Sequence, residues 1–149
     1  MPDISITVTN VSHDAWTRNN WVCGAGEDPN VNWTDQVSDT PGETLMPLSG
    51  RTTAAASTEH LGVIAQDALY MTLGYASPSG DEFAVSVMRR FHLFAIGAGD
   101  EWQTWDGSWS DWNEDTSQKV WNFANYTVTA TPTLTNETGA IDIVIKPAV

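Results

Sequence analysis

The chain has little of three things that decide what a small protein can do. It has one cysteine, Cys23, among its 149 residues, so no internal disulfide can form and folding must rely on a buried core. It has only 6 lysines and arginines against 19 acidic residues, and this net charge of −13 repels nucleic acids and anionic lipid surfaces. It has no apolar run near the roughly 20 residues that span a bilayer. Any membrane contact is therefore expected to be peripheral.

The first residues of the chain show neither the basic nor the apolar region of a secretory signal. We therefore expect a soluble protein that is synthesised in the cytoplasm, with release to act on external membranes left open. Without such a signal, the Asn-x-Ser/Thr triplets are expected to carry no glycans, and they are at Asn10, Asn32, Asn125 and Asn136. The length and the lack of a linker predict a single domain over residues 1–149.

What the sequence does contain is the period of two that is typical of half-buried β-strands. Residues 3–9 alternate apolar and polar side chains, with Ile4, Ile6 and Val8 on one face. A hairpin is predicted from residues 68–75 to 83–87 around a turn at 77–81. The side chains expected to point inward on it are Leu69, Met71, Leu73, Tyr75, Phe83, Val85 and Val87.

A second hairpin is predicted from residues 126–130 to 141–145, around a turn at 136–139. Weaker strand patterns cover residues 15–22, 31–37, 52–58 and 120–124. Many short strands separated by Gly, Pro, Asn and Asp predict an all-β protein, a two-sheet β-sandwich.

Tryptophan is unevenly distributed along the chain. Half of the 8 Trp lie within residues 99–115, an acidic stretch without Lys or Arg, and they are Trp102, Trp105, Trp109 and Trp112. Their spacing of three, four and three would place them along one stripe of a helix. Asp106-Gly107 in the middle favours a turn instead, so we predict a Trp-rich hairpin or an aromatic loop. The core is the favoured place for the other four, Trp16, Trp21, Trp33 and Trp121.

Patterns that carry catalysis or metal binding are weak. The three histidines are far apart, no Gly-x-Ser-x-Gly elbow occurs, and no pair of histidines has the spacing of a zinc site. Residues 111–115 begin like a calcium loop, but Thr116 replaces the required glycine and Asn122 the final glutamate. Surface acidity is the favoured interpretation. We therefore expect no enzymatic activity, no cofactor and no metal.

An acidic Trp-rich segment suits two kinds of ligand. The indole face attracts a quaternary ammonium group, and it also packs against the apolar face of a sugar whose hydroxyls Asp can bind. Arg89, next to Arg90, could meet a phosphate, and a salt bridge to nearby acidic residues is the favoured alternative. The candidate ligand-binding residues are Trp102, Trp105, Trp109, Trp112, Asp106, Asp111 and Arg89.

The order of these features resembles the aegerolysins, which are small, acidic, Trp-rich β-sandwich proteins that share a fold with the actinoporins. The matching elements are the opening strand at 4–12, Pro41–Leu45 leading into residues 50–58, the turn at 77–81, the aromatic segment, and the closing strand at 138–145. The resemblance spans most of the chain through short motifs.

The resemblance implies recognition of membrane lipids, chiefly sphingolipid headgroups, and no enzyme. It also implies the targeting component of a cytolysin or toxin, often with a separate pore-forming protein. The aromatic headgroup site of the actinoporins would correspond to residues 89–112 here. No segment for a pore-lining amphipathic helix precedes the first strand, so self-sufficient pore formation by that route is not expected. The same fold includes fungal fruit-body lectins, so carbohydrate binding is the alternative, and the oligomeric state is left open.

Overall fold

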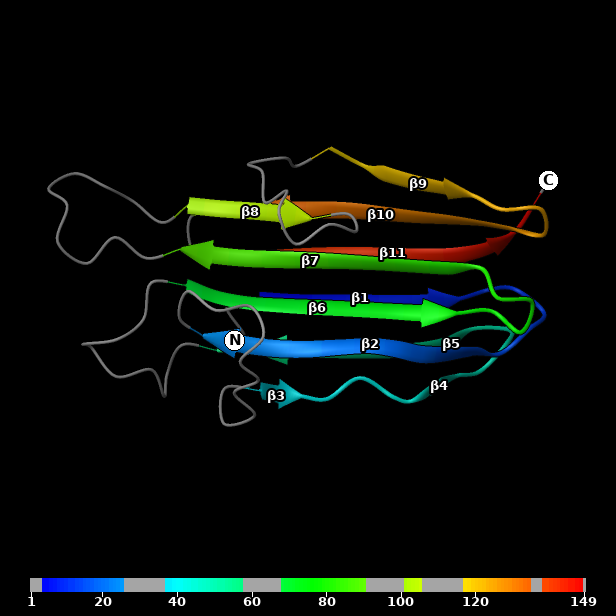
Figure 1. The fold of residues 1–149 in the computed structure, drawn as a ribbon, viewed down its shortest axis with the longest axis horizontal. Helices are drawn as coiled ribbons and strands as arrows, with labels where there is room; N and C mark the ends of the chain where they lie inside the picture. The colour runs from blue at the N-terminus through cyan, green and yellow to red at the C-terminus, as the bar shows by residue number, and fades with distance from the viewer. Residues whose placement is uncertain are drawn as a thin grey trace, which may run out of the picture.

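The strands of this protein form two sheets that stack face to face (Figure 1). The structure is a computed structural model, and it describes residues 4–25, 37–57, 68–90, 101–105, 117–134 and 138–148. All the regular structure in these ranges is β, in eleven strands. The predicted all-β, two-sheet sandwich is therefore confirmed.

One sheet has six strands and contains both ends of the described chain. Its strands, in spatial order, are β3 (Val37–Asp39), β5 (Gly50–Ala56), β1 (Ile4–Asn10), β11 (Gly139–Pro147), β10 (Tyr126–Leu134) and β9 (Lys119–Asn122). The first and last strands of the chain, β1 and β11, lie side by side and are parallel, whereas the other pairs are antiparallel. The pairing of β10 with β11 is the predicted second hairpin.

The other sheet has five strands, all antiparallel. In spatial order they are β4 (Thr44–Leu45), β2 (Trp16–Ala25), β6 (Ala68–Ala76), β7 (Glu82–Arg90) and β8 (Glu101–Trp105). The pairing of β6 with β7 is the predicted first hairpin. The strands predicted at 15–22, 52–58 and 120–124 correspond to β2, β5 and β9. Of the pattern at 31–37 only Val37, which begins β3, lies within the described residues.

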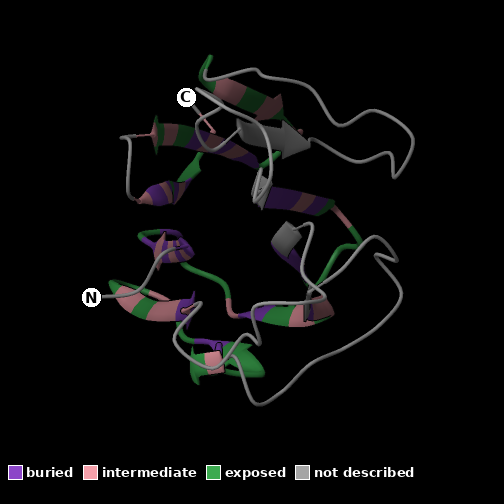
Figure 2. Cartoon of the chain, turned by 90° about the vertical axis from the view of Figure 1, so that its left-hand side faces the viewer, coloured by how far each residue is buried: buried purple, intermediate pink, exposed green. Residues whose placement is uncertain are grey.

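The core lies between the two sheets and is made by alternate positions of the longer strands. Figure 2, which looks along the strands, shows buried residues on the strands of both sheets, where they alternate with less buried ones. Ile4, Ile6 and Val8 of β1 are fully buried, as their alternation predicts. The inward-facing residues of the first hairpin that are confirmed in this core are Met71, Leu73, Tyr75, Phe83, Val85 and Val87. The side chain of Leu69 lies outside the described part.

Tryptophan contributes to this core as the sequence predicts. Trp16 is fully buried, and its ring centroid lies 5.7 Å from that of Phe83 and 4.9 Å from that of Tyr126. Its indole N–H has no hydrogen-bond partner within the described structure, so ring packing is its contribution there. Trp21 and Trp121 are partly buried against the same core. Trp33 lies outside the described residues.

The turn between β6 and β7 forms where the sequence places it. The Gly80 N–H donates to the Ser77 carbonyl oxygen at 3.0 Å, and the Asp81 N–H donates to the Ser77 hydroxyl at 3.1 Å. Gly80 has a φ of +92°, a conformation that other residues adopt at a cost. The hairpin register therefore follows from local turn chemistry.

The single cysteine is packed inside the sandwich. Cys23 is buried and free, and burial raises the pKa of its thiol to about 12. The thiol therefore stays protonated at neutral pH and cannot act as a thiolate nucleophile. Among the described residues, no helix is long and apolar enough to cross a membrane.

Candidate functional site

The predicted binding residues that the structure describes lie at one edge of the five-stranded sheet. Arg89 of β7 is the register partner of Trp102 of β8, and Arg90 is the partner of Glu101. Trp105 pairs with Ser86, further along the same two strands. Because β8 is the last strand of its sheet, we call this place the β7–β8 edge. The fold thus brings Arg89 and Trp102, thirteen positions apart in sequence, to adjacent positions.

The backbone of residues 101–105 is a strand. The helical stripe that the spacing of the tryptophans allows therefore does not exist at Trp102 and Trp105, in agreement with the predicted preference for a non-helical segment. The remaining predicted site residues lie outside the described part of the chain, and they are Asp106, Trp109, Asp111 and Trp112.

The β7–β8 edge lies toward one end of the sandwich. The register pairs Arg89 with Leu69 near the start of β6, whereas Ala76 at the end of β6 pairs with Glu82. Ala76 lies seven positions after Leu69 along β6, which is roughly 23 Å at the usual rise per residue. The turn between β6 and β7 is at the far end (Figure 1).

At that far end, a buried asparagine joins three segments of the chain. Asn10 is 0% exposed, and its amide nitrogen donates to the carbonyl oxygens of Asp14 at 2.8 Å, Met46 at 3.1 Å and Leu45 at 3.3 Å. Its amide oxygen accepts from the Ser12 N–H at 3.0 Å and from the Ser12 hydroxyl at 2.6 Å. Asn10 therefore fixes the connection between β1 and β2 and the connection after β4 relative to each other.

The connection from β4 to β5 turns at residues 46–49, which we call the apolar turn. Two large apolar side chains of the turn are exposed to solvent, since Met46 is 60% exposed and Leu48 is 63% exposed. The sequence analysis missed this feature. The available signal was Pro47, Ser49 and Gly50, which are turn residues that alternate with Met and Leu.

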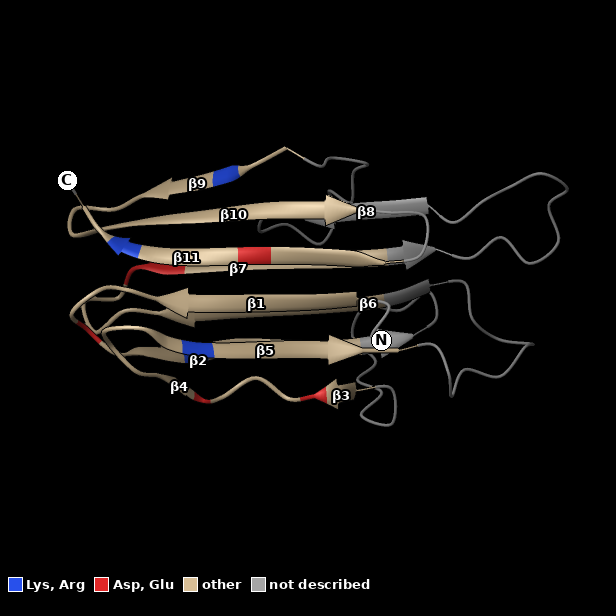
Figure 3. Ribbon diagram, turned by 180° about the vertical axis from the view of Figure 1, so that it is seen from behind, with Lys and Arg blue, Asp and Glu red and all other residues tan. Residues whose placement is uncertain are grey.

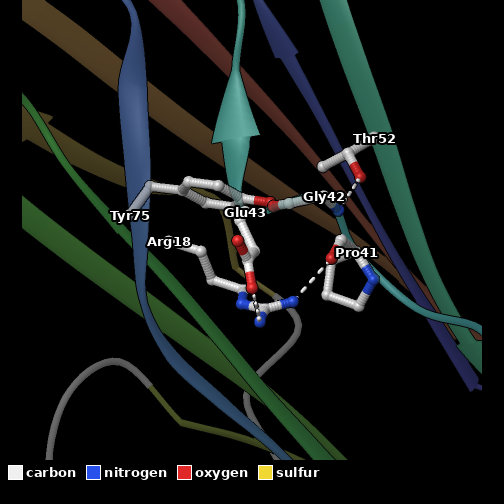
Figure 4. Close-up of polar contacts among 6 residues, drawn as sticks. All are labelled: Arg18, Pro41, Gly42, Glu43, Thr52 and Tyr75. Carbon is white, nitrogen blue, oxygen red and sulfur yellow. Dashed lines mark hydrogen bonds and ion pairs between the residues drawn. The ribbon is translucent and has the colours of Figure 1, made fainter.

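A second set of polar contacts holds the segment before β4 against the sheet (Figure 4). The Arg18 guanidinium donates to the Pro41 carbonyl oxygen at 2.6 Å, and it lies 3.8 Å from the Glu43 carboxylate. The Tyr75 hydroxyl donates to the Gly42 carbonyl oxygen at 2.6 Å. Because Glu43 is largely exposed, its ion pair with Arg18 contributes at most about 1 kcal/mol. We interpret this set of contacts as structural.

The charges described at this end are of both signs, and the cations among them are Arg18, Arg51 and Lys146. Figure 3 shows acidic residues in the connection between β1 and β2, beside β4, and at the start of β7. In sequence order these are Asp14, Glu43, Asp81 and Glu82. Within the described residues, no group of three or more His, Cys, Asp or Glu could hold a metal ion.

Tyr126 connects the core to Asp14 at this end of the sandwich. Its ring is buried next to Trp16, and its hydroxyl donates to a carboxylate oxygen of Asp14. Burial and the Asp14 carboxylate raise the pKa of Tyr126 to about 12, with a smaller contribution from Asp81. The folded state therefore favours the protonated phenol.

This pKa predicts a loss of stability at high pH. An unfolded tyrosine ionises near pH 10, so the stability from Tyr126 is present below about pH 10 and is lost as the pH rises toward about 12. The measurement is urea unfolding at about pH 9 and pH 11.5 for the parent protein and Tyr126→Phe. We expect the parent to lose more stability than the variant between the two pH values. Equal losses would contradict the assignment.

The described strands and their register define a class, an all-β protein of the two-sheet sandwich type. No family model and no curated protein matches the sequence. Among solved structures, the chain is similar to a mutated form of the Xerocomus chrysenteron lectin XCL, with a TM-score of 0.43 and 10% identity. That similarity covers 95% of this chain and 97% of the lectin chain. Membership of the aegerolysins stays a prediction, and the fold assignment rests on the strands themselves.

Proposed function

We propose that this protein is a non-enzymatic, peripheral membrane-binding module that recognises zwitterionic lipid headgroups at the β7–β8 edge. The observation that carries the proposal is the register of β7 with β8, which pairs Arg89 with Trp102. An arginine and a tryptophan at paired register positions would match the two halves of such a headgroup, an anionic phosphate and a cationic amine.

The pairing of Arg89 with Trp102 is informative because the chain has few cations. The chain has 6 lysines and arginines, and two of them, Arg89 and Arg90, are consecutive at the end of the strand that pairs with β8. A net charge of −13 repels anionic bilayers, so a single guanidinium can bind the phosphate of a neutral headgroup without attracting the protein to anionic lipid. The headgroup is expected to be that of a sphingolipid, as the resemblance to the aegerolysins implies.

The remaining predicted site residues complete this proposal. Trp105, Trp109 and Trp112 would add indole faces for the ammonium or for the bilayer interface, and Asp106 and Asp111 would favour the cationic part of the headgroup. No cofactor or metal takes part. A separate pore-forming protein is the proposed partner of this module, as the resemblance to the aegerolysins implies.

Carbohydrate binding is the second candidate, because the same combination of indole and carboxylate groups also suits a sugar. The two proposals differ in what Arg89 does. A neutral glycan has no phosphate for the guanidinium to bind, whereas a zwitterionic lipid does. Binding to a glycan array that is lost in Trp109→Ala, while the variant stays folded, would support the lectin.

The lipid proposal is tested by sedimentation with vesicles of sphingomyelin or ceramide phosphoethanolamine, with and without sterol, and with phosphatidylserine vesicles in parallel. We expect binding to at least one sphingolipid and none to phosphatidylserine. Arg89→Gln should weaken sphingolipid binding about tenfold, the loss expected when a charge-assisted hydrogen bond to phosphate is removed. The matched control is Arg51→Gln, an exposed arginine on β5 of the other sheet, which should bind like the parent.

Two results would contradict the lipid proposal. One is the absence of binding to either sphingolipid, with or without sterol. The other is an equal loss in Arg89→Gln and Arg51→Gln, because this would show a general effect of net charge and no specific phosphate contact.

A further inference from the structure

The apolar turn, residues 46–49, exposes apolar side chains that the proposed function does not use. Met46 and Leu48 are 60% and 63% exposed, and Val11, in the segment to which the turn is hydrogen-bonded, is 36% exposed. These are three of the four large apolar residues exposed in the described structure. The fourth, Val120, is on β9. Grouped exposure of apolar side chains marks a surface that binds something.

The backbone of the turn is held by the segment that follows β1. The Leu48 N–H donates to the Ser12 carbonyl oxygen at 3.0 Å, and the Ser49 N–H donates to the Asn10 carbonyl oxygen at 2.7 Å. The Asn10 amide nitrogen also donates to the Met46 carbonyl oxygen. The exposed side chains are therefore presented by a fixed backbone.

Two residues of the turn have a strained backbone. Leu48 has a φ of +58° and Ser49 a φ of +91°, values that favour glycine or asparagine. A leucine in the left-handed region gains nothing locally from its large side chain, which is also exposed to water. Strain of this kind persists where the surrounding structure enforces it, and it is concentrated at functional positions.

The area of this apolar surface and the net charge of the protein indicate which kind of partner covers the turn. Three partly exposed side chains present on the order of 300 Å² of surface, well below the roughly 800 Å² per partner of a stable protein interface. A bilayer has no such minimum, since each apolar side chain that enters it contributes by itself. The charges near the turn are mixed, but the net charge of −13 repels anionic lipid and leaves a neutral or zwitterionic bilayer.

We propose that the apolar turn is a second membrane contact, which inserts Met46 and Leu48 into the interface of a neutral or zwitterionic bilayer. It lies at the end of the sandwich opposite the β7–β8 edge, because Leu45 pairs with Trp16 next to the pairing of Thr17 with Ala76. The turn goes beyond the proposed function, which uses only the other end. Where both contacts operate, one molecule bridges two bilayers.

The test uses Leu48→Asn, which removes the apolar side chain and suits the left-handed backbone. In the Arg89→Gln background, sedimentation with zwitterionic phosphatidylcholine vesicles should show about tenfold weaker binding when Leu48→Asn is added. The matched control is Val120→Thr, which removes exposed apolar surface on β9 and should leave binding unchanged. Leu48→Gly is the second variant, for use if Leu48→Asn folds poorly. The left-handed backbone also accepts glycine, so Leu48→Gly is expected to show the same loss of binding.

Vesicle clustering, measured by light scattering, separates this proposal from the first. With Arg89 intact, Leu48→Asn should abolish clustering of sphingomyelin vesicles while the protein still sediments with them. If Arg89→Gln has no effect but Leu48→Asn weakens binding, the headgroup proposal is wrong and the apolar turn is supported. Unchanged vesicle binding in both Leu48 variants would overturn the second contact. So would a smaller oligomer in sedimentation velocity without loss of vesicle binding, because the turn would then contact protein.

Discussion

Gly50→Ala is expected to destabilise the protein by about 3 kcal/mol, measured as the free energy of unfolding in urea. A Cβ atom at this position would lie 2.1 Å from the carbonyl oxygen of Met46, and 2.8 Å from its carbonyl carbon and its nitrogen. All three are backbone atoms, so no side chain can rotate away to make room. The first residue of β5 must therefore separate from the apolar turn, and the hydrogen bonds that hold the turn are strained with it.

Gly42→Ala provides the matched control. A Cβ atom there would meet the Thr44 carbonyl oxygen and the Thr52 hydroxyl at 3.7 Å, which is ordinary van der Waals contact. We expect a change of less than about 1 kcal/mol, because the loss of backbone freedom in the unfolded chain offsets any small contact. Equal stability of Gly50→Ala and Gly42→Ala would contradict the close approach of Gly50 to the Met46 backbone.

Gly50→Ala is also expected to change membrane binding. A displaced turn no longer presents Met46 and Leu48 on a fixed backbone, so Gly50→Ala should weaken vesicle binding in the same direction as Leu48→Asn. Leu48→Asn should do so without a loss of stability. The pair of variants separates the exposed side chain from the backbone that positions it.

Much of the fold could be predicted because it follows from local sequence patterns. The alternation of Ile4, Ile6 and Val8 specifies which face of β1 is buried whatever its neighbours are. The turn at 77–81 sets the register of the β6–β7 hairpin through Ser77 and Gly80. Both patterns depend on residues close in sequence.

Features that depend on distant residues could not be predicted in this way. The parallel pairing of β1 with β11 joins the two ends of the chain and has no local signal. Strands β3 and β4 have three and two residues, too few for a period of two to be recognised. Met46 and Leu48 have the composition of core residues, and their exposure depends on contacts with Asn10 and Ser12, more than thirty positions earlier.

The candidate site was predicted in part. Composition located the Trp-rich segment, but the neighbour of Trp102 is set by the β7–β8 register, which pairs it with Arg89. The helical spacing of the tryptophans carried no information about Trp102 and Trp105, because a strand forms there. The burial of Asn10 could not be predicted either. This residue is part of an Asn-x-Ser triplet, yet it is fully buried and hydrogen-bonded to the backbone.

Asn10→Asp is expected to destabilise the protein by at least about 3 kcal/mol at neutral pH, although it preserves the shape of the side chain. The retained oxygen can still accept from the Ser12 N–H and hydroxyl. The second carboxylate oxygen replaces a donor, so it faces the carbonyl oxygens of Asp14, Leu45 and Met46 within 3.3 Å. A buried negative charge then meets three acceptors, and all three carbonyl groups lose their donor.

The measurement is the free energy of unfolding in urea, with Asn122→Asp as the matched control. Asn122 is exposed on the edge strand β9, so the same chemical change there should alter stability by less than about 0.5 kcal/mol. Similar effects of the two substitutions would contradict the donor role of Asn10. The expected difference between them isolates one amide group, which links β1 to the apolar turn and thereby holds the exposed Met46 and Leu48 in place.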